Sequence, residues 1–165
     1  MADGSYKAIE DVKIGDIVRS YDEVGDSVVS ARVVDVYHHS RDEMLDDYYL
    51  VINDRIRVTP NHCFYVNNNC VQAYFIRVGD MLLNENGEYE PVYSIEKVPS
   101  RVASYNLEVE TFHNYFAEGV LVHNDRKGEP PCFLAGTRVL MANSSYKNIE
   151  DIRVGDVVKV FNEDT

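Results

Sequence analysis

Residues 105–132 read YNLEVETFHNYFAEGVLVHNDRKGEPPC. An alternating apolar run ends in His123 and Asn124, a short polar segment follows, and the stretch closes on Cys132. The side-chain amide of an asparagine can attack its own peptide carbonyl, which cuts the chain after that asparagine. A cysteine can attack the carbonyl before it and turn an amide into a thioester. The stretch therefore holds two candidates for self-cleavage.

Composition limits the classes of partner. The chain has 165 residues, which suits one domain, and its apolar content allows a packed core. A net charge of −12 and a pI near 4.7 argue against a nucleic-acid or anionic-membrane partner. No apolar run approaches the roughly 18 residues of a membrane span. We expect no cofactor.

Three cysteines make an odd count, and this does not suggest a disulfide framework. Residues 1–11 lack the basic and apolar regions of a secretory signal, so the compartment stays open.

An internal repeat organises the chain. Residues 1–25 and 141–165, aligned at an offset of 140, are identical at 12 of 25 positions. The segment CFLAGTRVL precedes the second copy. The chain therefore resembles a window from a tandem array, with a domain over 1–124, a linker over 125–131 and the start of another unit over 132–165.

A shorter repeat lies within the unit. A basic residue, an apolar residue, Gly and Asp recur at 13–16, 77–80 and 153–156, each followed by two apolar residues. These pairs are typical of turns that enter strands, and the two halves of each unit suggest a pseudo-twofold sheet arrangement.

The rest of the pattern favours short strands rich in β-branched and aromatic residues, which predicts an all-β fold. The expected strands are 17–21, 28–37, 48–52, 56–59, 63–66, 81–83, 91–98, 105–109, 115–117 and 120–122, with a loop over 39–47. Asn53-Asp54, Asn67–Asn69, Asn86-Gly87 and Glu118-Gly119 are the expected turns.

Four further residues are candidates for chemistry. Thr59 and His62 can hydrogen-bond to the amide that precedes a nucleophile. The histidine would donate to the leaving nitrogen and the threonine to the carbonyl oxygen. His113 and His123 can exchange protons near pH 7 and so assist the cyclisation of Asn124. Each motif also has a purely structural interpretation, as a turn or a strand end, and Cys132 alone could be a core cysteine.

A zinc site is a separate possibility. His38, His39 and His62 with Cys63 and Cys70 supply suitable ligand types, but their spacing fits no standard zinc pattern. We assign no metal site.

Taken in order, Cys-x-x-x-Gly-Thr, Thr-x-x-His and the closing YNLxVxxxHNYFxxGVLVHN resemble the Hint superfamily of inteins, bacterial intein-like domains and hedgehog autoprocessing domains. The resemblance covers nearly the whole chain outside 125–131. It implies a horseshoe-shaped all-β fold with pseudo-twofold symmetry, and a domain that processes its own flanking polypeptide in a single turnover. It also implies a bacterial secreted or surface protein as host.

The resemblance further implies residue roles. Cys132 matches the residue that performs the N-to-S acyl shift at the bond before it, and Thr59 and His62 match the motif that activates that bond. His113 matches the histidine that assists cyclisation, and His123 with Asn124 matches the closing pair.

Three departures modify that expectation. Asp125 stands where inteins need Cys, Ser or Thr, so standard splicing should fail and cleavage should replace it. Asn106 stands where many inteins have Asp, and Pro131 puts a tertiary amide and a fixed φ before the nucleophile. The alternative function is a non-catalytic β module in a repeat array.

The repeat also raises a question of connectivity. We expect 132–140 to fold back as the missing first strand of the unit made by 1–124. Residues 141–165 then compete with 1–25 for one place, and the displaced copy stays unfolded or pairs with a second molecule in a strand-swapped homodimer.

Overall fold

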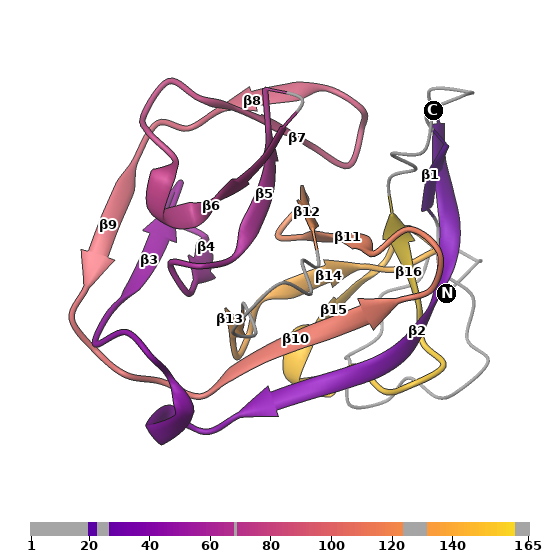
Figure 1. Cartoon of the computed structure of the whole chain (residues 1–165). Coiled ribbons are helices and arrows are strands. Elements are labelled where there is room, and N and C mark those ends of the chain that lie inside the picture. Colours follow the sequence, from indigo (N-terminus) through magenta and orange to yellow (C-terminus); the bar gives the residue numbers. More distant parts are fainter. Residues whose placement is uncertain (1–19, 23–26, 68, 124–131, 161–165) are drawn as a thin grey trace.

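The computed structural model describes residues 20–22, 27–67, 69–123 and 132–160 (Figure 1). Strands make up most of the described chain, as the sequence predicts. They are β1 (Ser20–Asp22), β2 (Ser27–His39), β3 (Tyr49–Ile52), β4 (Ile56–Val58), β5 (Cys63–Val66), β6 (Asn69–Gln72), β7 (Met81–Leu83), β8 (Tyr89–Pro91), β9 (Ile95–Val98), β10 (Ser104–Val109), β11 (Asn114–Ala117), β12 (Val120–His123), β13 (Phe133–Leu134), β14 (Arg138–Leu140), β15 (Tyr146–Asn148) and β16 (Val157–Val160). In the described part of the chain, three short 3-10 helices interrupt them, namely η2 (Arg41–Glu43), η3 (Ala73–Phe75) and η4 (Ile149–Asp151).

The described strands form two sheets. One has the order β1-β2-β10-β13-β4-β3-β9, with β16 also paired to β2, and the other has the order β15-β14-β11-β12-β5-β7-β8, with β6 also paired to β5. Every pairing between the described strands is antiparallel, and β2 and β10 run as long neighbours through the molecule (Figure 1). The predicted all-β class is therefore confirmed.

The two halves of the unit repeat the same local structure. In each half, a strand leads into a 3-10 helix, a turn and a second strand, as β6-η3-β7 and as β15-η4-β16. The side chain of Asp80 accepts a hydrogen bond from the backbone of Arg77 at 2.8 Å, and that of Asp156 accepts one from the backbone of Arg153 at 2.9 Å. The glycine before each aspartate has a positive φ, 99° and 95°. The Gly-Asp repeat in the sequence is thus a repeated turn, and it carries the pseudo-twofold symmetry.

Residues 132–160 are part of both sheets. β13 lies between β10 and β4, with Phe133 opposite both Tyr105 and Val58. β14 pairs with β11, and β16 pairs with β2. The boundary at 124 inferred from the repeat stays a prediction about the chain's units, since these strands take part in a fold built mainly by 27–123.

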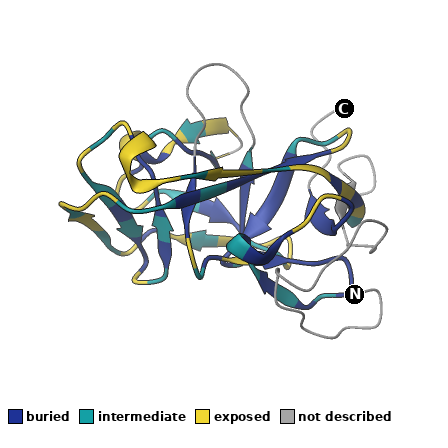
Figure 2. Ribbon diagram, turned by 90° about the horizontal axis from the view of Figure 1, so that it is seen from below, coloured by how far each residue is buried: buried dark blue, intermediate teal, exposed yellow. Residues whose placement is uncertain are grey.

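The core fills the space between the sheets, where Figure 2 shows the buried residues concentrated along the strands. One large apolar cluster includes Phe64, Leu107, Tyr115, Val122 and Phe133, all below 1% exposed. Four of these five side chains come from 27–123 and Phe133 from β13, so the second segment is packed as core. Among the described residues, no helix is long and apolar enough to cross a membrane.

Several strand predictions need correction. The expected strand 91–98 is two strands, β8 and β9, because the side-chain oxygen of Asn53 accepts hydrogen bonds from the backbone of Tyr93 and Ser94 between them. β6 was not expected, since three of its four residues are exposed and polar or cysteine. β2 continues to His39, so the expected loop 39–47 begins after it and contains η2. Residues 17–19 of the first expected strand lie outside the described residues.

Candidate active site

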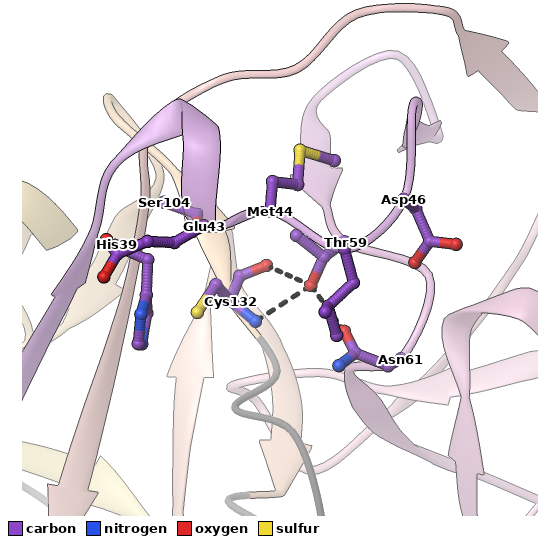
Figure 3. Close-up of a pocket in the computed structure, with 9 residues that line it drawn as sticks. His39, Glu43, Met44, Asp46, Thr59, Asn61, Ser104 and Cys132 are labelled. Atoms are coloured by element: carbon purple, nitrogen blue, oxygen red, sulfur yellow. Dashed lines mark hydrogen bonds between the residues drawn. The ribbon is translucent and has the colours of Figure 1, made fainter.

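Cys132 and Thr59 form the centre of the site. The backbone N–H of Cys132 donates to the Thr59 hydroxyl at 2.9 Å, and the Thr59 hydroxyl lies 2.9 Å from the Cys132 carbonyl oxygen (Figure 3). The backbone N–H of Thr59 donates to the same carbonyl at 2.9 Å, which extends the β4–β13 pairing by one residue. The hydroxyl proton is shared between this carbonyl and the side-chain oxygen of Asn61 at 2.8 Å. The Thr59 hydroxyl is therefore held against the nitrogen of the peptide bond between residues 131 and 132.

The thiol of Cys132 is protected from water. Cys132 as a whole is only 2% exposed to solvent. Burial raises the pKa of the Cys132 thiol from 9.0 to about 12, and a hydrogen bond to the Ser104 side chain partly offsets this rise. A protonated thiol is a poor nucleophile, so attack by Cys132 requires a group that removes its proton.

His62 packs against β13. Its ring is fully buried, 4.1 Å from the ring of Phe133 and 5.9 Å from that of Phe64. The Thr59–His62 segment is a turn, closed by a hydrogen bond from the His62 N–H to the Thr59 carbonyl at 3.2 Å. Since Phe133 follows Cys132 directly, the turn brings the imidazole to the residue beside the nucleophile.

His123 lies at the end of β12, next to the same turn. Its Cα partner on β5 is Cys63, which follows His62, and its partner on β11 is Asn114. Through the contact of His62 with Phe133 and the pairing of Cys63 with His123, the end of β12 lies in the same region as Cys132. Asn124 lies outside the described residues.

His113 lies in the turn between β10 and β11 with a positive φ of 53°. Its Nδ1 is 2.6 Å from the carboxylate of Glu108, whose side chain is only 7% exposed. Such a carboxylate orients the imidazole ring. It leaves the other ring nitrogen available for a reacting group.

Asn106 has a structural part in the site. Its side-chain oxygen accepts hydrogen bonds from the Leu107 backbone at 2.8 Å and from the Tyr115 hydroxyl at 2.9 Å. Burial, and next the charge of Cys132, raise the pKa of Tyr115 well above its ordinary value. Asn106 therefore fixes a neutral tyrosine beside Cys132, and its amide cannot serve as a base.

A cavity of about 230 Å³ opens beside Cys132 (Figure 3). It is lined by His39, Glu43, Met44, Leu45, Asp46, Thr59, Asn61, Ser104 and Cys132. The Nε2 atom of His39 is buried, and no described residue forms a hydrogen bond with it. The sequence offered His39 only as a zinc ligand. Its place comes from the register of β2 with β10, which pairs His39 with Ser104, the partner of the Cys132 thiol.

A disulfide joins Cys63 to Cys70, which corrects the expectation drawn from the odd cysteine count. The two residues lie on the paired strands β5 and β6, with their Cα atoms 5.7 Å apart, a separation that suits a disulfide. The odd cysteine is Cys132. The bond also uses both sulfur ligands of the possible zinc site, and no cluster of metal ligands occurs among the described residues.

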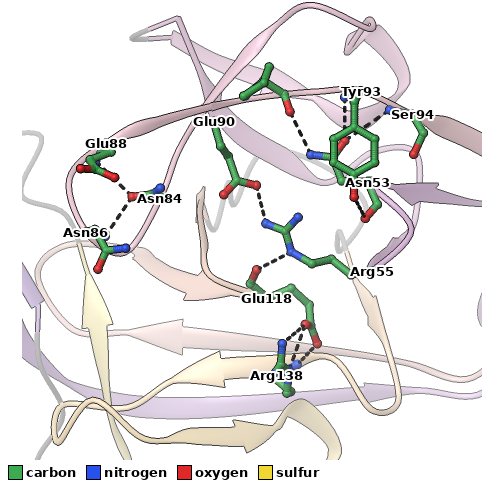
Figure 4. Close-up of polar contacts among 11 residues, drawn as sticks. Asn53, Arg55, Asn84, Asn86, Glu88, Glu90, Tyr93, Ser94, Glu118 and Arg138 are labelled. Atoms are coloured by element: carbon green, nitrogen blue, oxygen red, sulfur yellow. Dashed lines mark hydrogen bonds and ion pairs between the residues drawn. The ribbon is translucent and has the colours of Figure 1, made fainter.

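A second polar network anchors β14, away from Cys132 (Figure 4). The carboxylate of Glu118 accepts hydrogen bonds from the backbone of Arg138 at 2.5 Å and from its guanidinium at 3.1 Å. The Glu118 carbonyl accepts a hydrogen bond from Arg55 at 3.1 Å, and Arg55 also pairs with Glu90. Glu118 has a φ of 49°, as the predicted Glu118-Gly119 turn requires. This network stabilises the contact between the second segment and the β11–β12 hairpin.

Known proteins resemble this chain in sequence and fold. The family model of the pretoxin Hint domain matches residues 1–125. A bacterial intein-like domain from Clostridium thermocellum is 31% identical, with 70% of this chain and 86% of that chain covered and a TM-score of 0.58. The DnaX mini intein from Spirulina platensis is 26% identical, with coverage of 70% and 88% and a TM-score of 0.52. No curated protein matches the chain.

The fold is also that of the gp41-1 intein, which is 20% identical with a TM-score of 0.52 and coverage of 72% and 87%. At the level of the family, these relationships support autocatalytic processing that acts on the chain's own flanking polypeptide. With a family match over most of its length, two curled antiparallel sheets and Thr59 fixed on the Cys132 amide, the chain belongs to the pretoxin Hint domain family.

Proposed function

We propose that the chain cleaves itself at two bonds, before Cys132 and after Asn124. The observation that carries the proposal is the hydrogen bond between the Cys132 N–H and the Thr59 hydroxyl in a buried site. This nitrogen is the leaving group of the first step. A residue that merely packs in a core has no need of a hydroxyl at that atom.

In the first step, the Cys132 thiolate attacks the carbonyl carbon of residue 131. A C–S bond forms, the C–N bond to Cys132 breaks, and the nitrogen takes up a proton. The hydroxyl of Thr59 holds the nitrogen, and His62, next to Phe133, supplies the proton. Water or an added thiol then releases the thioester.

A base is needed because burial holds the thiol in its protonated form at neutral pH. His39 meets this need, since it lines the same cavity as Cys132 and its buried Nε2 forms no hydrogen bond with a described residue. Imidazole can accept a proton near pH 7. We assign His39 as the proton acceptor for the thiol.

In the second step, the side-chain amide of Asn124 attacks its own carbonyl carbon, forms a succinimide and releases the amine of Asp125. His113 directly precedes Asn114, the Cα partner of His123, and His123 directly precedes Asn124 in the sequence, which supports a role for His113. The Glu108 carboxylate orients its ring. Because Asp125 has no hydroxyl or thiol to accept an acyl group, the two cuts would release the flanking pieces without joining them.

Mass spectrometry of the purified chain tests the proposal. We expect a fragment 1–124 that ends in a succinimide or its hydrolysis product, absent from Asn124→Ala. Dithiothreitol should release a peptide that begins at Cys132, absent from Cys132→Ala. This variant keeps Cys63 and Cys70, so it controls for reduction of the disulfide.

The alternative, a β module without activity, makes the opposite prediction. Asn106 favours it, since its side-chain oxygen is already used by Leu107 and Tyr115. Intact mass after long incubation at neutral pH, with and without dithiothreitol, would support the inactive module and contradict self-cleavage.

A further inference from the structure

The cavity beside Cys132 adjoins a second hollow of the described residues. This hollow has a volume of about 200 Å³ and is lined by Asp46, Tyr48, Pro60, Asn61, Gln72 and Tyr74. Asp46 and Asn61 also line the cavity beside Cys132, so the two spaces meet at these residues. A water molecule needs only about 15 Å³ of cavity. The space of about 230 Å³ beside Cys132 can therefore receive a larger molecule than water.

The cavity beside Cys132 has a negative lining. Glu43 and Asp46 both line it, and neither forms an ion pair with a described lysine or arginine (Figure 3). Hydrogen bonds from the backbone and the side chain of Ser40 lower the pKa of Glu43, so this carboxylate is ionised at neutral pH. No described lysine or arginine lines the cavity. Its charge therefore favours a cation.

The other lining residues suit an alkyl chain and an ammonium group. Met44 is buried and Leu45 is exposed, and both line the cavity between the two carboxylates in the sequence. In the second hollow, the ring of Tyr48 already binds an ammonium group of the chain itself, since the Nζ atom of Lys97 lies 3.9 Å from the ring centroid. Methylene groups and an ammonium group are thus the ligand chemistry that this region matches.

We propose that a primary alkylamine enters the cavity as its ammonium ion and takes the acyl group from Cys132. The inference rests on the proposed function, because it needs the thioester that the first step forms. It identifies the class of molecule that accepts the released upstream polypeptide, where water would otherwise do so. Glu43 and Asp46 are the residues that select the acceptor by its charge.

The transfer uses groups that the site already contains. His39 returns the proton of the first step to water and then accepts one from the ammonium group, because it lines the cavity and its buried Nε2 forms no hydrogen bond with a described residue. The neutral amine attacks the carbonyl carbon of residue 131. A C–N bond forms and the C–S bond to Cys132 breaks. The nitrogen loses two protons in all, of which one ends on the Cys132 sulfur and the other reaches solvent through His39.

Thiols of different charge test the selection of the acceptor. Cysteamine carries an ammonium group, 2-mercaptoethanol is neutral and 2-mercaptoethanesulfonate carries a sulfonate. The experiment uses intact chain, verified by mass, at low ionic strength and equal thiolate concentration, and it measures release before Cys132 by mass spectrometry. Cysteamine should act at least about tenfold faster than the sulfonate. In the double variant Glu43→Gln, Asp46→Asn this ratio should fall to about 1 to 2.

A matched double variant is the control. Asp42→Asn, Asp47→Asn removes the same charge from the same segment, at residues that do not line the cavity, and should keep the ratio. Glu43→Gln retains a side-chain oxygen for the hydrogen bond from the Ser40 backbone, which Glu43 accepts at 2.6 Å. A ratio that falls equally in both double variants, or that is near 1 in the unchanged chain, would overturn the inference.

Amines test the transfer itself. With 1,5-diaminopentane or a peptide that contains one lysine, we expect an upstream fragment that carries the amine on the carbonyl of residue 131. A product with the diamine alone identifies a small amine as the acceptor, and a product with the peptide identifies a lysine side chain. Cleavage by 2-mercaptoethanol without either amine product would overturn the inference and leave the proposed function intact.

Binding separates failure of the inference from failure of the proposed function. If 2-mercaptoethanol releases nothing, the proposed function fails, and binding of 1,5-diaminopentane to Cys132→Ala, followed by NMR, then decides whether the site exists. Binding that is lost in the cavity double variant and kept in the control double variant would support the site. Equal binding in both, or none in the unchanged cavity, would overturn it.

Discussion

Thr59 holds Cys132 by two backbone groups at once, since its hydroxyl accepts from the Cys132 N–H and its own N–H donates to the Cys132 carbonyl, each at 2.9 Å. The backbone contact is part of the strand pairing and would survive any substitution of the Thr59 side chain. The hydroxyl contact would not. The structural and chemical parts of this residue can therefore be separated.

Replacing Thr59 by valine should lower the rate of thiol-dependent release before Cys132 by about 100-fold, because the leaving nitrogen loses a positioned partner. Thr59→Ser retains the hydroxyl and should stay within about tenfold of the unchanged chain. The rate is measured by mass spectrometry after dithiothreitol is added. Equal release rates in Thr59→Val and Thr59→Ser would show that the Thr59 hydroxyl takes no part in the reaction.

His39→Gln should slow the same release by about 100-fold, the lower end of what a positioned general base contributes. The neighbouring His38 provides the control, since it is exposed and stacks on Tyr105 with ring centroids 4.7 Å apart. His38→Gln should leave the rate unchanged. If both variants behave alike, the cavity histidine is not the proton acceptor.

Stability should fall at alkaline pH through Cys132. Its pKa is 9.0 unfolded and about 12 folded, so the unfolded chain loses this proton first as pH rises. The contribution of the buried thiol to the free energy of unfolding is therefore fully present below pH 9 and is lost as the pH rises toward 12. At pH 10 the loss amounts to about 1.4 kcal/mol.

Urea unfolding at pH 8 and pH 10 measures this effect, and Cys132→Ser is the comparison because it has no thiol to ionise. Relative to Cys132→Ser, the unchanged chain should lose unfolding free energy between pH 8 and pH 10. A constant difference would show that the thiol is not held in a dry site.

Cys70→Ser should lower the free energy of unfolding by about 2 kcal/mol, the value expected when a short disulfide-closed loop is opened. The bond joins β5 to β6 just after His62, so cleavage should slow as well. Unfolding in urea with and without the substitution gives the first quantity. An unchanged midpoint in oxidised protein would contradict the first expectation.

The sequence predicted the fold well where local chemistry determines it. The Gly-Asp turns, the Asn53-Asp54 turn and most strands follow from residues with strong local preferences, and Asn53 and Asp54 both have the positive φ that such a hairpin turn requires. β6 was missed because its exposed polar residues carry no alternating pattern and it pairs only with β5.

The site was predicted in part, and for a physical reason. The Cys132 and Thr59 motifs are local, and the structure brings those two residues together. The place of His39 depends on the long-range register between β2 and β10, which no local pattern contains. The disulfide was missed for a similar reason, because an odd count cannot show which cysteine is left over.

The Cys63–Cys70 bond ties the molecule to its redox surroundings. Disulfides persist in oxidising compartments and are reduced where glutathione and thioredoxin operate. The same polypeptide would therefore hold three thiols in one setting and a single thiol in the other. Counting reactive sulfhydryls in material taken directly from cells would show which form had been present at the moment of cutting.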